Sequence, residues 1–197
     1  MGIGISGQMH GEVLMDENNC VLEQVRLWCN ARNAAEGDEL TNIFQVKVPK
    51  RATRARFLWT IRHHQNLAEQ TQHVTTPAGW MARVLTGQYN LGSGDAAGMF
   101  PVNPQTRDYD TKLLDLYHGL VQAKNPNVLP LQQLLPSIRR AGQDAGFLTE
   151  SGASLLGIPY DDMHNLKIPV AAGEGDQVAA LAGSLIGNAG TISYRFG

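Results

Sequence analysis

The chain has 197 residues, of which 43% are hydrophobic and 17% are charged, and its formal net charge at pH 7 is −2. A chain of this length can bury one core, and this composition is typical of a globular protein rather than a disordered one. The charge excludes a strongly basic surface for nucleic acid or an anionic membrane, and no apolar run reaches the roughly 18 residues of a membrane-spanning helix. Without a signal peptide in the sequence, we expect a cytoplasmic protein that binds neither nucleic acid nor a membrane.

The cysteines and histidines give no metal-binding pattern. Cys20 and Cys29 are too few for a disulfide framework, and no Cys-x-x-Cys pair is present. His63 and His64 stand beside basic residues on a predicted helix, which favours a solvated helix face over a pair of ligands. We therefore expect no metal site.

The first part of the chain is predicted to form strands joined by tight turns. The expected strands are Met1–Ser6, Glu12–Met15 and Val21–Trp28, with turns at Gly7–Gly11 and Asp16–Asn19. The first turn carries an amide, a thioether and an imidazole between two glycines, in Gln8, Met9 and His10. Because this turn joins two strands, its side chains should emerge at a sheet edge.

Helices are predicted for much of the chain after Trp28, at Ala31–Phe44, Thr53–His64, Pro77–Leu85, Tyr109–Leu120 and Ser151–Leu156. On Thr53–His64 the apolar residues Phe57, Leu58 and Ile61 should face inward and the arginines Arg54, Arg56 and Arg62 outward. A phosphate site formed by these arginines is the alternative, but a solvated helix face is the favoured interpretation. Pro126–Pro136 is predicted to be a linker, and Leu91–Phe100 is glycine-rich around Asp95.

A strand-to-helix corner near the end of the chain carries one carboxylate. Val170–Gly173 is a short apolar strand, Val178–Ser184 a helix of small residues, and Thr191–Tyr194 a further strand. Asp176 lies between the first two, near a helix N-terminus, where α/β proteins commonly place ligands. Either Asp176 caps the helix, because aspartate is a favoured N-cap, or it has a catalytic role.

Several of these stretches together resemble one protein family. Gly4–Gly11 resembles the signature that xylulokinases carry within the FGGY family of carbohydrate kinases. Further landmarks occur in family order: Leu27-Trp28 with Arg32, Thr53–His63 with Trp59, Leu85–Gly87, Asp95–Gly98 and Val170–Asp176. The resemblance extends over nearly the whole chain. No single landmark is decisive, but their number and order together identify the family.

The resemblance implies a fold and a site. The fold would be α/β, the ribonuclease-H-like fold of actin and hexokinase, with a mixed sheet flanked by helices. Asp176 would be the catalytic base, and the sugar would contact Gln8, Met9, His10 and Gln177. ATP and Mg²⁺ would be the cofactors of the intact enzyme, and a homodimer is common in similar kinases. From the residues alone, a turn histidine with only structural hydrogen bonds is the favoured interpretation of His10, and the resemblance favours contact with the substrate.

The sequence departs from the family pattern in the middle and at both ends. Asn30 stands in place of an aspartate, Arg56 of a lysine and Gly79 of an acidic residue, and Glu174 and Gln177 stand where glycine and asparagine are commoner. These departures leave the sugar open. Relative to the family, the opening phosphate loop (Asp-x-Gly-Thr) and the C-terminal nucleotide domain are expected to lie outside residues 1–197. The chain would then be a partial N-terminal sugar-binding domain with an exposed sheet edge near Met1–Ser6.

Three functions remain open. The first is an ATP-dependent pentulose kinase, with D-xylulose favoured and this chain alone inactive. The second is a kinase of the same family for another sugar or polyol. The third is a non-catalytic module that binds only a sugar or a partner.

Overall fold

The computed structural model describes residues 2–140, 142–159, 167–185, 190 and 192. The helices are α1 (Ala34–Phe44), α2 (Thr53–His63), α3 (Gln65–Gln70), α4 (Pro77–Thr86), α5 (Ser93–Met99), α6 (Thr111–Gln122), α7 (Leu131–Leu134), α8 (Glu150–Leu155) and α9 (Asp176–Gly183). The strands are β1 (Ser6–Gly7), β2 (Val13–Met15), β3 (His73–Thr75), β4 (Asn90–Gly92), β5 (Ser137–Arg139), β6 (Asp144–Phe147), β7 (Pro169–Ala171) and β8 (Glu174–Gly175). Every helix predicted from the sequence is present, with ends that differ by a few residues.

The strands pair in a mixed pattern. β1 runs parallel to β8 and β4 parallel to β5, whereas β2–β3 and β6–β7 are antiparallel pairs. Backbone bonds from Ala171 N–H to Ile3 O and from Glu174 N–H to Ile5 O extend the β1–β8 pairing, and Gly92 N–H donates to Gly173 O. The fold class is therefore α/β with mixed strand pairing and helices around it, as predicted.

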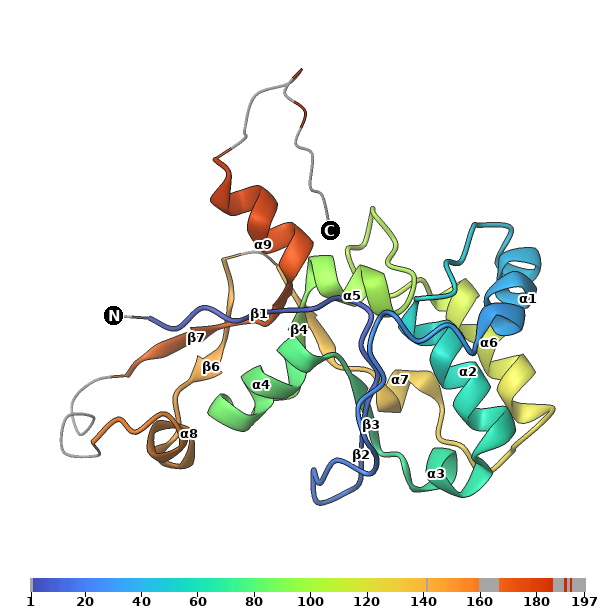
Figure 1. Ribbon diagram of the computed structural model, residues 1–197, viewed down its shortest axis with the longest axis horizontal. Helices are drawn as coiled ribbons and strands as arrows, with labels where there is room; N and C mark the ends of the chain where they lie inside the picture. The colour runs from blue at the N-terminus through green and yellow to red at the C-terminus, as the bar shows by residue number, and fades with distance from the viewer. Residues whose placement is uncertain (1, 141, 160–166, 186–189, 191, 193–197) are drawn as a thin grey trace.

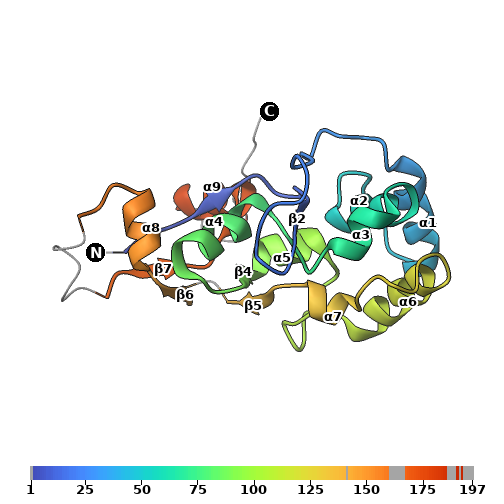
Figure 2. The same ribbon diagram turned by 90° about the horizontal axis from the view of Figure 1, so that it is seen from below.

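The two larger apolar cores of the described residues lie at opposite ends of an elongated molecule (Figures 1 and 2). The larger one is formed mainly by α1, α2, α5, α6 and α7, and its fully buried members include Leu40, Phe57, Leu58, Ile61, Phe100 and Tyr117. The smaller one joins α4, α8, β7 and the segment before β1 through Leu85, Leu148, Ala153, Ile168 and Val170. β1 runs from the smaller core toward the helical end, where the chain turns back (Figure 1).

The exposed edge expected near Met1–Ser6 is present in the described residues. β1 pairs with β8 on one side, and no second partner strand is seen for it there. Gly4 and Ser6 are exposed. An edge of this kind leaves backbone N–H and C=O groups available to another strand.

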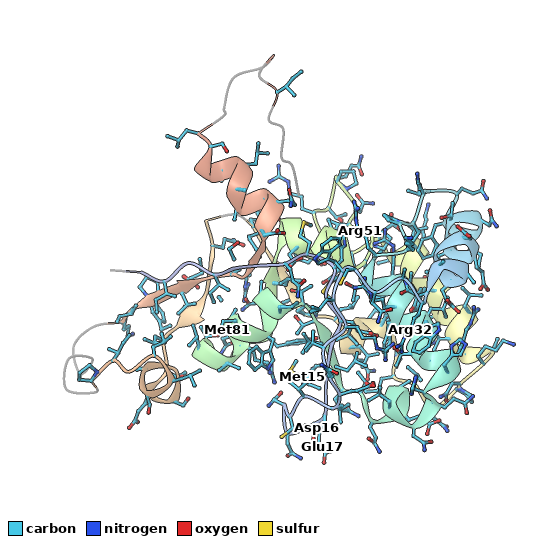
Figure 3. All side chains as sticks on the ribbon, viewed as in Figure 1. Met15, Asp16, Glu17, Arg32, Arg51 and Met81 are labelled. Atoms are coloured by element: carbon cyan, nitrogen blue, oxygen red, sulfur yellow. The ribbon has the colours of Figure 1, made fainter. Side chains whose placement is uncertain are left out.

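The predicted returning strand Val21–Trp28 is wrong. This segment makes only isolated bridges to β2 and its flank, Met15 with Val21 and Glu12 with Arg26. Val21 and Arg26 are farther apart in the sequence than their partners Met15 and Glu12. One regular ladder of paired residues therefore cannot include both bridges. β2 pairs with β3 instead. Asp16 and Glu17 form the tip of the connecting turn, as predicted (Figure 3).

The predicted outward position of the arginines on α2 is also wrong for two of them. Arg54 and Arg56 are only 9% and 1% exposed, respectively. Each guanidinium is buried because it donates to backbone carbonyls, that of Arg54 to Met99 O at 3.3 Å. Arg62 alone reaches the surface, where it pairs with Glu36 and Glu39.

The predicted linker Pro126–Pro136 is wrong as well. It contains α7, and Leu131 and Leu134 of that helix are buried in the larger core. The strand predicted at Thr191–Tyr194 lies outside the described residues, except for Ile192.

The backbone N–H groups at the start of α5 bind a carboxylate from a distant part of the chain. Glu174 accepts hydrogen bonds from the N–H groups of Gly94 (3.4 Å) and Asp95 (3.1 Å). Asp95 itself is fully buried, and its Oδ2 accepts a 2.6 Å bond from Thr76 Oγ1. The pKa of Asp95 is raised from 3.8 to about 7, chiefly by burial and also by the charges of Glu174 and Asp176, against the lowering effect of the Thr76 bond.

This raised pKa predicts a pH-dependent stability. Folded Asp95 keeps its proton up to about pH 7, whereas the unfolded chain releases it near pH 3.8. The contribution of Asp95 to the free energy of unfolding is therefore complete below pH 3.8 and is lost as the pH rises to 7. The loss is at most about 4 kcal/mol. In urea unfolding at a series of pH values, Asp95→Asn should remove this decline. Asp115→Asn, an exposed aspartate on α6, is the control. A decline of equal size in Asp95→Asn would contradict the assignment.

Candidate functional site

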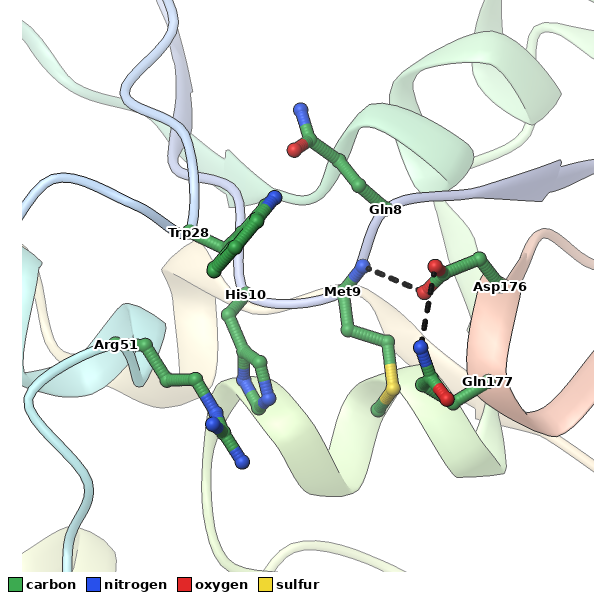
Figure 4. Close-up of a pocket in the computed structure, with 7 residues that line it drawn as sticks. All are labelled: Gln8, Met9, His10, Trp28, Arg51, Asp176 and Gln177. Atoms are coloured by element: carbon green, nitrogen blue, oxygen red, sulfur yellow. Dashed lines mark hydrogen bonds between the residues drawn. The ribbon is translucent and has the colours of Figure 1, made fainter. Parts of the chain in front are cut away.

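The turn after β1 and the start of α9 meet at one pocket. The parallel pairing of β1 with β8 places Gly7 opposite Gly175, so the residues just after each strand emerge together. Met9 N–H donates to Asp176 Oδ1 at 3.4 Å across this junction. The pocket has a volume of about 700 Å³, and its lining residues are Gln8, Met9, His10, Trp28, Arg51, Asp176 and Gln177 (Figure 4).

Asp176 is the first residue of α9. The N-cap of that helix is Gly175, so the capping alternative for Asp176 is not what the structure shows. Its Oδ2 lies 3.5 Å from Gln177 Nε2, and its Oδ1 faces the turn. A carboxylate in the first turn of a helix is favourably placed in the helix dipole.

Two glycines allow the turn to approach both helices closely. A Cβ on Gly175 would lie 2.3 Å from Met9 Cγ, and a Cβ on Gly98 would lie 3.2 Å from the His10 ring. Met9 therefore packs over the start of α9, while His10 packs against α5. A larger residue does not fit at Gly175, whereas at Gly98 the side chains of the turn would have to shift to admit one.

The orientation and charge of His10 are set by its surroundings. Its backbone adopts a left-handed conformation with φ of 65°, and its Nδ1 lies 3.1 Å from Gly98 O. Nδ1 must be the protonated nitrogen in this contact, because a carbonyl can only accept. Burial lowers the pKa of His10, and the charges of Arg51, Arg54 and Arg56 lower it further against the raising effect of the Gly98 bond. At neutral pH the ring is therefore uncharged, and Nε2 is left as an acceptor.

The structure brings all the sequence-predicted site residues to this pocket, but not in equivalent positions. Met9, Asp176 and Gln177 lie side by side, whereas the Gln8 side chain extends away from Asp176 (Figure 4). Their roles toward a sugar remain predictions.

Sequence reasoning missed two pocket residues. Trp28 is 55% exposed, and its indole presents a flat apolar face to the pocket. Its place in the family landmark around Leu27-Trp28 was the available signal. Arg51 lies next to His10, just before α2 (Figures 3 and 4). No local pattern marked Arg51, which stands at the end of a basic connector.

No cage for a metal ion is found in the described part of the chain, because no three or more His, Cys, Asp or Glu side chains gather there in a suitable group. Nor does any helix in that part have the length and apolar character needed to cross a membrane.

Comparisons with known proteins agree on one family. The model of the FGGY family of carbohydrate kinases, N-terminal domain, matches residues 1–183. Xylulose kinase from Haemophilus influenzae is 25% identical over 193 residues, covering 93% of this chain and 36% of the relative. Xylulose kinase from Escherichia coli is 26% identical over 192 residues, covering 92% of this chain and 35% of the relative. The chain thus spans about a third of the length of these relatives.

The fold agrees with that of solved sugar kinases. The xylulose kinase structure from Rhodospirillum rubrum superposes with a TM-score of 0.77 at 21% identity, covering 96% of this chain and 37% of that one. This likeness confirms the predicted actin- and hexokinase-like fold. Because the family model covers most of its length, the chain belongs to the FGGY family of carbohydrate kinases.

Proposed function

We propose that the intact protein phosphorylates a pentulose with ATP, converting D-xylulose to D-xylulose 5-phosphate. The observation that carries the proposal is the position of Asp176, whose carboxylate lies at the wall of a pocket that also holds His10 and Trp28. The names of the xylulose kinase relatives support the choice of sugar.

Asp176 acts in the proposal as a general base. The sugar hydroxyl gives its proton to the carboxylate while its oxygen bonds to the γ-phosphorus, and the bond from that phosphorus to ADP breaks. The bond from Met9 N–H to Oδ1 fixes the direction of the carboxylate. Such a reaction relies mainly on positioning and on the stabilisation of charge.

The sugar is held by the remaining pocket residues. Neutral His10 accepts a hydrogen bond from a sugar hydroxyl at Nε2, because Nδ1 is occupied by Gly98 O. Trp28 offers its ring to the C–H face of the sugar, and Gln8 and Gln177 offer amides to hydroxyls.

We infer that ATP is held by regions outside these 197 residues. The family model that matches is that of the N-terminal domain, and the chain spans about a third of its relatives. Mg²⁺ would be bound mainly through phosphate oxygens, as is usual for this ion. The enzyme is proposed to act in the cytoplasm as a homodimer.

Arg51 supports a second candidate, a kinase for a sugar with an anionic group. In the described part of the chain its guanidinium has neither a salt bridge nor a side-chain hydrogen bond, although it lines the pocket. An unpaired guanidinium favours a carboxylate or phosphate on the ligand.

A sugar panel tests these alternatives. An enzyme that includes the flanking regions is assayed for ADP production with D-xylulose, other pentuloses, glycerol and a sugar acid. The largest kcat/KM for D-xylulose would support the first proposal, and the largest for the sugar acid would support the second. No ADP production with any sugar, despite binding, would leave the non-catalytic alternative.

In that enzyme, Asp176→Asn should lower kcat by about 10²–10⁴-fold with a much smaller change in sugar affinity, because the amide keeps the shape but cannot accept the proton. Steady-state kinetics with the preferred sugar measure both constants. Near-normal turnover would remove Asp176 from the catalytic role.

His10→Ala should instead raise KM for the sugar, by about tenfold or more, because it removes a binding contact and leaves the base in place. The same kinetic assay separates KM from kcat. An unchanged KM would return His10 to a purely structural role in the turn.

The chain by itself should not phosphorylate any sugar, because the phosphoryl donor must be held in line with the acceptor and a misplacement of about 1 Å can cost a hundredfold. Its sugar affinity should be about millimolar. The purified chain is incubated with ATP, magnesium and D-xylulose, with its Asp176→Asn variant as control. Sugar-dependent ADP release above the control would contradict this prediction.

A further inference from the structure

A buried arginine beneath the pocket connects two segments that line it. Arg56 on α2 is 1% exposed. Its Nη1 donates to the carbonyl of His10, and its Nη2 donates to the carbonyl of Asn30 at 3.3 Å. The first carbonyl belongs to the turn after β1, and the second lies two residues after Trp28.

The segment around Trp28 has few other fixed points. It is not part of a strand, and the nearest bridge to β2 and its flank is at Arg26. Within the described part of the chain, the bond from Arg56 to Asn30 O is the one hydrogen bond that joins residues 27–32 to another segment. The 55% exposed Trp28 side chain contributes little burial of its own.

The turn carrying His10 depends on external contacts as well. A non-glycine residue in the left-handed region is unfavourable by itself and persists when its surroundings impose it. The carbonyl of His10 is held by Arg56 while its side chain is held by Gly98 O. The two bonds therefore hold both the backbone and the side chain of His10.

The positive charge of the Arg56 guanidinium interacts with the carboxylate of Glu12. Glu12 is 2% exposed, accepts a 2.9 Å bond from Thr60 and lies 3.5 Å from Arg26 Nε. Burial lowers the pKa of Arg56, and the negative charge of Glu12 opposes that change. A charged donor makes stronger bonds to carbonyls than a neutral one, and the planar fork of arginine can reach two acceptors at once.

We propose that Arg56 is a positioning residue that sets the placement of His10 and Trp28 around the pocket. Arg56 is not among the residues that line the pocket, and it acts through the two carbonyls. Its effect on sugar affinity rests on the proposed function, whereas its effect on the two pocket side chains does not.

Arg54 provides a matched control. It stands on the same helix, is similarly buried at 9% exposure, and also donates to a backbone carbonyl, that of Met99. It bonds to neither the His10 turn nor the Trp28 segment. Loss of Arg54 therefore measures the general cost of removing a buried arginine from α2.

Nuclear magnetic resonance on the 197-residue chain tests the positioning directly. The indole N–H signals are assigned with Trp28→Phe and Trp80→Phe, and the His10 ring signals with His10→Ala. In Arg56→Met the Trp28 and His10 signals should shift or broaden, while the Trp80 signal on α4 stays in place and reports that the chain is folded. Arg54→Met should leave the Trp28 signal unchanged, and it should move the His10 signals less than Arg56→Met does, because it removes a charge that lowers the His10 pKa but no bond to the His10 backbone. If Arg56→Met does not fold, Arg56→Lys takes its place, because lysine keeps the charge but not the two-pronged geometry.

Calorimetric titration with D-xylulose gives the second measurement. Arg56→Met should weaken binding by about tenfold, the equivalent of one lost hydrogen bond, and Arg54→Met by less than about twofold. The proposal is overturned if the Trp28 and His10 signals match those of the parent chain, if Arg54→Met moves them equally, or if the affinities of the two variants are alike. If the parent chain binds no sugar, the proposed function loses its support from this chain, and the resonance result alone decides the role of Arg56.

Discussion

The parallel pairing of β1 with β8 determines where the site lies. It brings Met9 and Asp176 together although they are 167 residues apart in the chain. In a parallel pair the segments after both strands leave at the same edge, so the turn and the helix meet there without any further device. The glycines that end the two strands allow close packing at this junction, because a Cβ on Gly7 would lie 3.1 Å from Ala78 N on α4 and a Cβ on Gly175 would lie 2.3 Å from Met9 Cγ.

Three carboxylates come to this edge, and the fold gives each a different environment. Glu174 is bound to the N–H groups at the start of α5. Asp95 is buried, and its pKa of about 7 keeps a large share of it protonated at neutral pH. Asp176 is the carboxylate that lines the pocket. The three carboxylates therefore have different surroundings, and of these three only Asp176 is among the residues that line the pocket.

The sequence allowed the helices and the site turn to be predicted because both depend on local patterns. Apolar spacing marked α2 through Phe57, Leu58 and Ile61, which are fully buried, and the glycine-bracketed turn marked Gln8–His10. The failures concern long-range contacts. Arg54 and Arg56 resemble surface arginines by spacing alone, and only carbonyls from distant segments make their burial possible. Likewise, Val21–Trp28 has a strand-like sequence, but its bridges to β2 and its flank remain isolated.

The same distant contacts explain why the pocket could be only partly predicted. Trp28 and Arg51 belong to irregular segments whose course is set by bonds to other elements rather than by their own sequence. Arg51 and the buried arginines of α2 make the His10 side of the pocket positive. Burial lowers the pKa of His10, and these positive charges lower it further, so the ring stays neutral. The opposite side holds Asp176 near Glu174 and Asp95. In the function proposed above, a ligand lies between these two sides, and a hydroxyl group turns its proton toward Asp176 and its oxygen lone pairs toward the arginine side. For a sugar acceptor, this is the orientation in which the carboxylate can remove the proton and the oxygen can be phosphorylated.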